Sequence, residues 1–184
     1  MRLASTVLFA LLLSPLAFPR PAAPAQGPSI QAEAERLTGW GYVPEIVQAV
    51  QDQNAKRVSL DSIRRIDAAW IYATKESVRM RRLMSNRCAE KLKALAGLQP
   101  NYREAMVMDD QGALVCITRR TTDYWQGDEA KWQRAFNDGR GTLFIDDPKY
   151  DESVGMTLVH ISVPVIDGGR TIGVVTVGLE PDGE

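Results

Sequence analysis

Apolar residues recur at helical spacing through the first half of the chain. They form one-sided stripes, each on a single helix face: Ile30, Ala34 and Leu37; Ile46, Ala49 and Val50; Ile63, Ile66 and Trp70; and Met80, Met84, Cys88, Leu92 and Leu95. Pro44 suits the first turn of one helix, and Ser59 can cap the next. Because neither glycine nor proline interrupts residues 45–95, residues 60–96 form either one long helix or two helices that meet near Thr74.

The second half of the chain has the alternating pattern and frequent turns of an antiparallel sheet. The predicted strands cover residues 103–109, 113–118, 142–145, 156–166 and 171–180. Turns rich in aspartate and glycine separate them at 109–112 and 167–169. A short helix is predicted between Gly127 and Gly139. The chain therefore belongs to the α+β class, with helices first and a five- to six-stranded antiparallel sheet afterwards.

The strand predicted at 156–166 has two different faces. Val159, Ile161, Val163 and Val165 point to one side, and Leu158, His160, Ser162 and Pro164 point to the other. The first set should pack on the helical stripes. The second is partly polar, and if the segment 119–155 covers it, the sequence predicts a pocket there.

Residues 1–25 have the pattern of a secretory signal peptide. Arg2 precedes an apolar run, and Ala23 and Ala25 suit a cleavage site. The alternative is an uncleaved anchor, but the run is shorter than the ~20 residues that a membrane span needs. We expect a periplasmic or secreted protein without a membrane span in the mature chain. Its helical segment is 26–59, and its main domain is 60–184.

Composition narrows the class of function. The 184 residues carry a formal net charge of -1, whereas nucleic-acid-binding proteins usually show a basic excess. One histidine and two cysteines are too few for the usual zinc site. A cluster of acidic residues at 146, 147, 151 and 152 leaves calcium as an alternative, because calcium prefers oxygen ligands, but the spacing does not match the twelve-residue calcium loop. We therefore expect no metal, no cofactor and no nucleic-acid partner.

The densest group of binding-type side chains lies between residues 121 and 132. Aromatic faces from Tyr124, Trp125 and Trp132, with charges from Asp128 and Lys131, can orient a small polar ligand. The alternative is that both tryptophans anchor the core and that Asp128 favours a helix N-terminus.

His160 is the only histidine, and Ser162 follows it on the same strand face. Catalysis by His160 would need a nucleophile and an orienting acid in defined geometry. The chain contains no glycine-flanked serine elbow, phosphate loop or dinucleotide fingerprint. We therefore expect a protein that is not an enzyme, in which both residues contribute hydrogen bonds to the pocket. A hydrolase that uses His160 stays as an alternative.

Two considerations disagree on whether Cys88 and Cys116 form a disulfide. Export and the even count favour pairing. A helix packed on a sheet lies ~10 Å away, however, whereas a disulfide needs Cα atoms within about 7 Å. The balance slightly favours unpaired cysteines.

Residues from about 80 to 180 resemble the extracellular PDC or Cache sensor domains, which have a PAS-like fold. The resemblance rests on a helix leading into a strand and on four segments: Asp109–Val115, Thr121–Trp132, Asp147–Ser153, and Ile161–Val165 with Ile172–Gly178. The middle string is similar to that of small stand-alone secreted bacterial members.

The resemblance implies an antiparallel sheet with a long N-terminal helix across one face and a ligand site over the other. It implies an amino acid, an organic acid or a similar small polar ligand. Trp132 matches the ligand-reading tryptophan of double-domain members, Gln133 stands where they have tyrosine, and Lys131 is the nearest cation. Asp147 or Asp151, on either side of Tyr150, matches their later aspartate.

We therefore expect an exported sensor-type domain that captures a small polar solute and presents the signal to a membrane sensor or envelope protein. Its expected ligand-binding residues are Tyr124, Trp125, Asp128, Lys131, Trp132, Asp147, Tyr150, Asp151, His160 and Ser162. The alternative is a ligand-free protein-protein interaction module of the cell envelope, and a homodimer is one form that this module could take.

Overall fold

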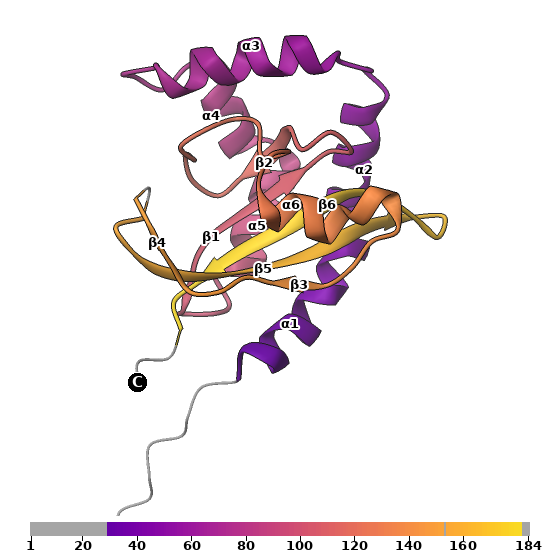
Figure 1. Ribbon diagram of the computed structural model, residues 1–184, viewed down its shortest axis with the longest axis vertical. Coiled ribbons are helices and arrows are strands. Elements are labelled where there is room, and N and C mark those ends of the chain that lie inside the picture. The colour runs from indigo at the N-terminus through magenta and orange to yellow at the C-terminus, as the bar shows by residue number, and fades with distance from the viewer. Residues whose placement is uncertain (1–28, 153, 182–184) are drawn as a thin grey trace, which may run out of the picture.

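The computed structural model describes residues 29–152 and 154–181 (Figure 1). The predicted signal peptide lies outside the described residues. The helical half contains α1 (Ile30–Thr38), the 3-10 helix η1 (Gly39–Tyr42), α2 (Pro44–Asn54), α3 (Leu60–Ile71), α4 (Val78–Ser85) and α5 (Arg87–Ala96). The second half contains β1 (Tyr102–Met108), β2 (Leu114–Ile117), α6 (Ala130–Phe136), the 3-10 helix η2 (Asn137–Gly139), β3 (Phe144–Ile145), β4 (Lys149–Asp151), β5 (Met156–Asp167) and β6 (Arg170–Leu179).

Local capping explains where the helices begin. Pro44 occupies the first turn of α2, and Ser59 caps α3 by accepting a hydrogen bond from the Ser62 amide. Ser77 caps α4, and Asn86 caps α5 through the Ala89 amide at 2.8 Å. Since Asn86 has an extended backbone (φ -74°, ψ 167°), it ends one helix and starts another. Residues 60–96 therefore form three helices in place of one or two.

The six strands form one antiparallel sheet in the order β2-β1-β6-β5-β3, and β4 also pairs with β5. The long β5–β6 hairpin is its centre, with Val163 opposite Val175. Gly168 and Gly169 close this hairpin with positive φ angles of 53° and 77°, a conformation that glycine adopts without steric cost. The structure thus confirms the predicted α+β class, the antiparallel sheet and its closing hairpin.

The sheet separates two apolar clusters, which define its two faces. On the helical face, strand residues such as Val159, Ile161 and Val177 pack with Leu37, Ile46 and Leu92 of α1, α2 and α5. On the other face, Met106, Met108 and Val174 pack with residues of α3, α4 and α6. Figure 1 shows α6 in front of the sheet and α5 behind it. The valine-rich face thus packs on the stripes of α1, α2 and α5 as predicted, whereas the apolar side chains of α3 and α4 pack on the opposite face.

A disulfide joins Cys88 to Cys116, with Cα atoms 5.8 Å apart, so the expectation of unpaired cysteines is wrong. Cys88 lies in the first turn of α5, not in the middle of a helix that crosses the sheet. The Asn86 side chain donates a hydrogen bond to the Val115 carbonyl at 3.0 Å, which holds this helix end against β2. A helix terminus at a sheet edge can come closer than the ~10 Å typical of a helix lying across a sheet.

None of the helices in the described part of the chain is both long enough and apolar enough to cross a membrane.

Candidate functional site

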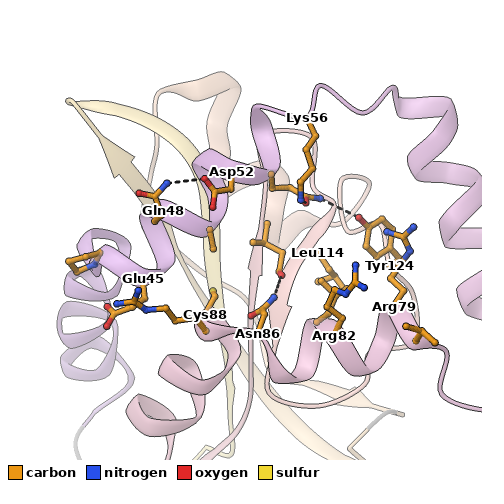
Figure 2. A pocket seen from close by; sticks show the side chains of 17 residues that line it. Glu45, Gln48, Asp52, Lys56, Arg79, Arg82, Asn86, Cys88, Leu114 and Tyr124 are labelled. Carbon is orange, nitrogen blue, oxygen red and sulfur yellow. Dashed lines mark hydrogen bonds between the residues drawn. The ribbon is translucent and has the colours of Figure 1, made fainter.

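A cavity of about 830 Å³ lies between α2, α4, the start of α5 and the edge strand β2. We call this cavity the α2–α4 groove, and Figure 2 shows the side chains that line it. It is lined by Pro44, Glu45, Gln48, Ala49, Asp52, Gln53, Lys56, Val78, Arg79, Arg82, Leu83, Asn86, Arg87, Cys88, Leu114, Val115 and Tyr124. This volume is in the range of small-molecule sites.

Helical periodicity brings these side chains to the groove. On α2, Ile46 and Val50 are buried against the sheet, and Glu45, Gln48 and Asp52 share another face at i, i+3 and i+7. On α4, Met80 is the buried anchor, and Arg79, Arg82 and Asn86 follow the same spacing. The two polar helix faces therefore lie opposite one another across the groove (Figure 2).

The charges in the groove are unevenly distributed. Its two acids, Glu45 and Asp52, come from α2, whereas α4 and α5 supply three arginines, and Lys56 follows α2. The four cations and two acids give the lining a net charge of +2. The pKa of Glu45 lies below its usual value, chiefly because of a backbone hydrogen bond and also because of Lys91 and Arg87. The groove thus has an acidic wall, a basic wall and an excess of positive charge.

Tyr124 supplies the polar end of the groove. Its hydroxyl accepts a hydrogen bond from Gln53 Nε2 at 3.4 Å, and Lys56 Nζ donates to Gln53 Oε1 at 3.2 Å. The Arg79 guanidinium lies 6.0 Å from the ring centre of Tyr124, at the limit of a cation–π contact. Burial raises the pKa of the Tyr124 phenol, and the charge of Asp109 adds to this. The phenol therefore stays protonated at neutral pH and can donate a hydrogen bond.

Of the predicted ligand-binding residues, Tyr124 lines the α2–α4 groove. Both predicted tryptophans bond to backbone carbonyls: Trp125 Nε1 donates to Gln111 at 2.7 Å and Trp132 Nε1 to Asp109 at 3.0 Å. Trp132 also stacks on Phe136 with ring centres 4.8 Å apart. Both tryptophans are partly buried and pack against the apolar cluster on the face toward α3, α4 and α6.

The remaining predicted residues lie in several places. Lys131 is buried and pairs with Glu129 at 3.0 Å, whereas Asp128, Asp147 and Tyr150 are exposed. Ser162 Oγ lies 2.7 Å from Thr176 Oγ1 on the sheet face under α6. The structure does bring Asp151 and His160 together, with Oδ2 and Nε2 3.8 Å apart.

Sequence reasoning missed the groove residues of α2 and α4. Their signal was present: polar positions on both helices repeat at helical spacing beside the apolar stripe. A polar helix face is usually solvated, however, and no pattern within either helix indicates that the two faces meet in the folded protein.

No family model and no curated protein matches this chain. Solved structures similar to it include the extracellular domain of rpHK1S-Z16, described as a histidine kinase (20% identity, TM-score 0.42, 82% of this chain and 58% of that chain covered). A second is an extracellular ligand-binding receptor from Desulfohalobium retbaense (18%, TM-score 0.41, 75% and 25% covered). A third is the ligand-binding domain of the Campylobacter jejuni chemoreceptor Tlp3 with L-norvaline (14%, TM-score 0.44, 81% and 59% covered).

The first of these is an extracellular domain, the second is an extracellular ligand-binding receptor, and the third is a ligand-binding domain. The chain spans about three fifths of the length of the first and third and a quarter of the second.

Proposed function

We propose that this protein is an exported sensor-type domain that binds a small carboxylate-bearing solute in the α2–α4 groove. The observation that carries this proposal is the cavity of about 830 Å³ whose lining has a net charge of +2. A groove of this size can enclose an amino acid or an organic acid together with water.

The division of charge suggests how the solute would bind. Arg79, Arg82 and Arg87 can hold a carboxylate, because a guanidinium presents a planar fork of donors that matches two carboxylate oxygens. The opposite wall, with Glu45 and Asp52, suits an ammonium group. A solute with both groups, such as an amino acid, satisfies both walls at once, whereas a simple organic acid uses the arginine wall alone.

The Cys88–Cys116 disulfide supports the proposed location. Disulfides persist in the periplasm and outside the cell and are rare in the cytosol. Together with the predicted signal peptide, this favours export. A membrane sensor or envelope protein would then read the change in surface that occurs when the solute ties α4 to α2.

The test is a thermal-shift screen of the protein against amino acids, including L-norvaline and 4-aminobutyrate, and against organic acids. A solute at 100 times its dissociation constant adds ~2.7 kcal/mol to the free energy of unfolding. Arg82→Ala should weaken the affinity for any stabilising solute by about 10- to 100-fold, because it removes a charge-assisted hydrogen bond.

Arg81→Ala is the matched control, since Arg81 is next to Arg82 but bonds to the Glu76 carbonyl at 2.7 Å and does not line the groove. Equal affinity of wild type and Arg82→Ala for every stabilising solute would refute the site. A folded protein that no solute in the panel stabilises would refute the function.

The second candidate, a ligand-free interaction module, is favoured by an exposed apolar group where α3 leads into α4. Ile71, Tyr72 and Val78 are 50%, 84% and 65% exposed, and such patches mark interaction surfaces. Sedimentation over a range of concentrations distinguishes the two functions. A dimer that survives dilution and that Tyr72→Ser dissociates would favour the module.

A further inference from the structure

Three side chains that are far apart in the sequence meet beside the strand β5. Glu104 comes from β1, Asp151 from β4 and His160 from β5. Each offers one ligand atom, and these atoms lie within 4.8 Å of one another. His160 Nε2 is 3.0 Å from Glu104 Oε1 and 3.8 Å from Asp151 Oδ2. We call these residues the Glu104 cluster; it shares no residue with the α2–α4 groove.

The register of the sheet builds this cluster. Glu104 and His160 both stand opposite Gly178, from the two sides of β6. A Cβ at Gly178 would come within 2.8 Å of Glu104 Cγ and 3.2 Å of His160 Nε2. A glycine at this position therefore lets a carboxylate and an imidazole two strands apart touch across the strand between them.

Glu104 has bonding capacity that the protein leaves unused. Its side chain is 3% exposed, and its Oε2 atom is buried without a hydrogen-bond partner among the described residues. A buried carboxylate oxygen without a partner is costly, and a nearby cation removes that cost. Because Oε1 of the same carboxylate already faces His160 Nε2, the unused oxygen belongs to the cluster itself.

The separations match those around a four-coordinate metal ion. Zinc binds nitrogen and oxygen ligands at about 2.0–2.2 Å, so tetrahedral ligands lie about 3.3 Å apart. The 3.0 and 3.8 Å separations within the cluster bracket this value. Two carboxylates and a neutral imidazole also balance the charge of a divalent ion.

We propose that Glu104, Asp151 and His160 bind a divalent transition-metal ion, zinc by preference, and leave one coordination position open. An imidazole beside two carboxylates suits zinc, whereas calcium takes oxygen ligands and more of them. One histidine and two cysteines are too few for a zinc site built from those residues alone, but carboxylates also bind zinc. The bound ion would link β4 to β1, in addition to the pairing of β4 with β5.

Calorimetric titration of the tag-free, disulfide-bonded protein with zinc chloride tests this. We expect one zinc ion per chain. His160 is the only histidine and both cysteines are oxidised, so a shift of the Nε2 signal of its imidazole in the ¹⁵N NMR spectrum reports this site. Asp151→Asn should lower zinc affinity at least about tenfold, since even the loss of an outer-shell partner costs 10- to 100-fold.

The matched control is Asp147→Asn, which removes an exposed acid four residues away and should leave affinity unchanged. Glu104→Gln is a second variant, and circular dichroism checks that each variant is folded. No stoichiometric zinc binding, or zinc binding that leaves the His160 signal unmoved, would overturn the proposal. The proposal would also be overturned if Asp151→Asn and Glu104→Gln both folded and bound zinc with wild-type affinity, because acids on the surface would then hold the ion.

Discussion

The two faces of the sheet are built by the same alternating strands but bury different kinds of side chain. The face toward α1, α2 and α5 is mostly aliphatic, with Ile161 and Val177 fully buried among leucines and valines, and its buried hydrogen bond from the Tyr102 hydroxyl to Glu33 is an exception. The face toward α6 is mixed: Glu104, His160, Ser162 and Thr176 form buried polar contacts between its apolar side chains. Both faces are covered, so burial alone does not distinguish them.

The difference lies in what each buried contact contributes. Burying an aliphatic side chain stabilises the fold by removing apolar surface from water. A buried polar pair contributes little net stability but is expensive to leave incomplete. Apolar burial on both faces therefore stabilises the fold. The buried polar pairs on the face toward α6 add a requirement that particular side chains meet.

The largest expected effect is on the aliphatic face. Ile161→Ala should lower the free energy of unfolding by about 3 kcal/mol, because it removes buried methylene groups and leaves a cavity. Urea denaturation followed by circular dichroism measures this. Thr157→Ala, at an exposed position on the same strand, should change stability by no more than about 0.5 kcal/mol. A loss below about 1 kcal/mol for Ile161→Ala would contradict the assignment of the core to this face.

A smaller effect concerns the charge buried in the turn after β1. Burial raises the pKa of Asp109 from 3.8 to about 6, although its Oδ1 accepts hydrogen bonds from the Gln111 and Ala113 amides, both at 2.9 Å. Between these two pH values the folded state binds more protons than the unfolded state, so stability falls as the pH rises. An asparagine side chain at this position would keep an oxygen for both bonds without the charge.

Asp109→Asn should therefore raise stability at pH 7 by about 1–2 kcal/mol and have little effect at pH 4. It should also flatten the stability curve between those values. Asp123, whose pKa burial also raises to about 6, keeps part of the slope. Denaturation at several pH values measures the gain at pH 7 and the slope of stability against pH. Asp128→Asn, at an exposed position, is the control. If Asp109→Asn lowered stability equally at pH 4 and pH 7, the charge of the Asp109 carboxylate would not be what lowers stability at neutral pH.

The smallest effect tests the polar face. Ser162→Ala leaves the Thr176 hydroxyl without its partner at 2.7 Å and should cost about 1 kcal/mol. Ser162→Ala with Thr176→Val removes both hydroxyl groups and should cost less than the single change. A double-mutant cycle by urea denaturation measures the coupling. Additive losses would mean that the two hydroxyl groups do not depend on one another.

Much of the fold follows from local patterns. The starts of α2 and α3 depend on Pro44 and Ser59, and the last hairpin depends on Gly168 and Gly169, so nearby residues suffice to predict them. The site was less predictable. The aromatic-acidic segment drew attention to Trp125 and Trp132, whose indoles bond to backbone carbonyls, whereas the polar faces of α2 and α4 looked like ordinary solvated surfaces.

The sequence by itself determined the α+β class, the order of a helical half before a strand-rich half, and which side of β5 carries the aliphatic residues. These follow from periods of 3.6 and 2.0 residues, which are properties of the chain within each element. Only the tertiary structure decided that Cys88 reaches Cys116, that α2 faces α4 across a groove, and that Gly178 aligns Glu104 with His160. Each of these depends on strand register or on the position of a helix end. Long-range packing sets both, and no local pattern encodes them.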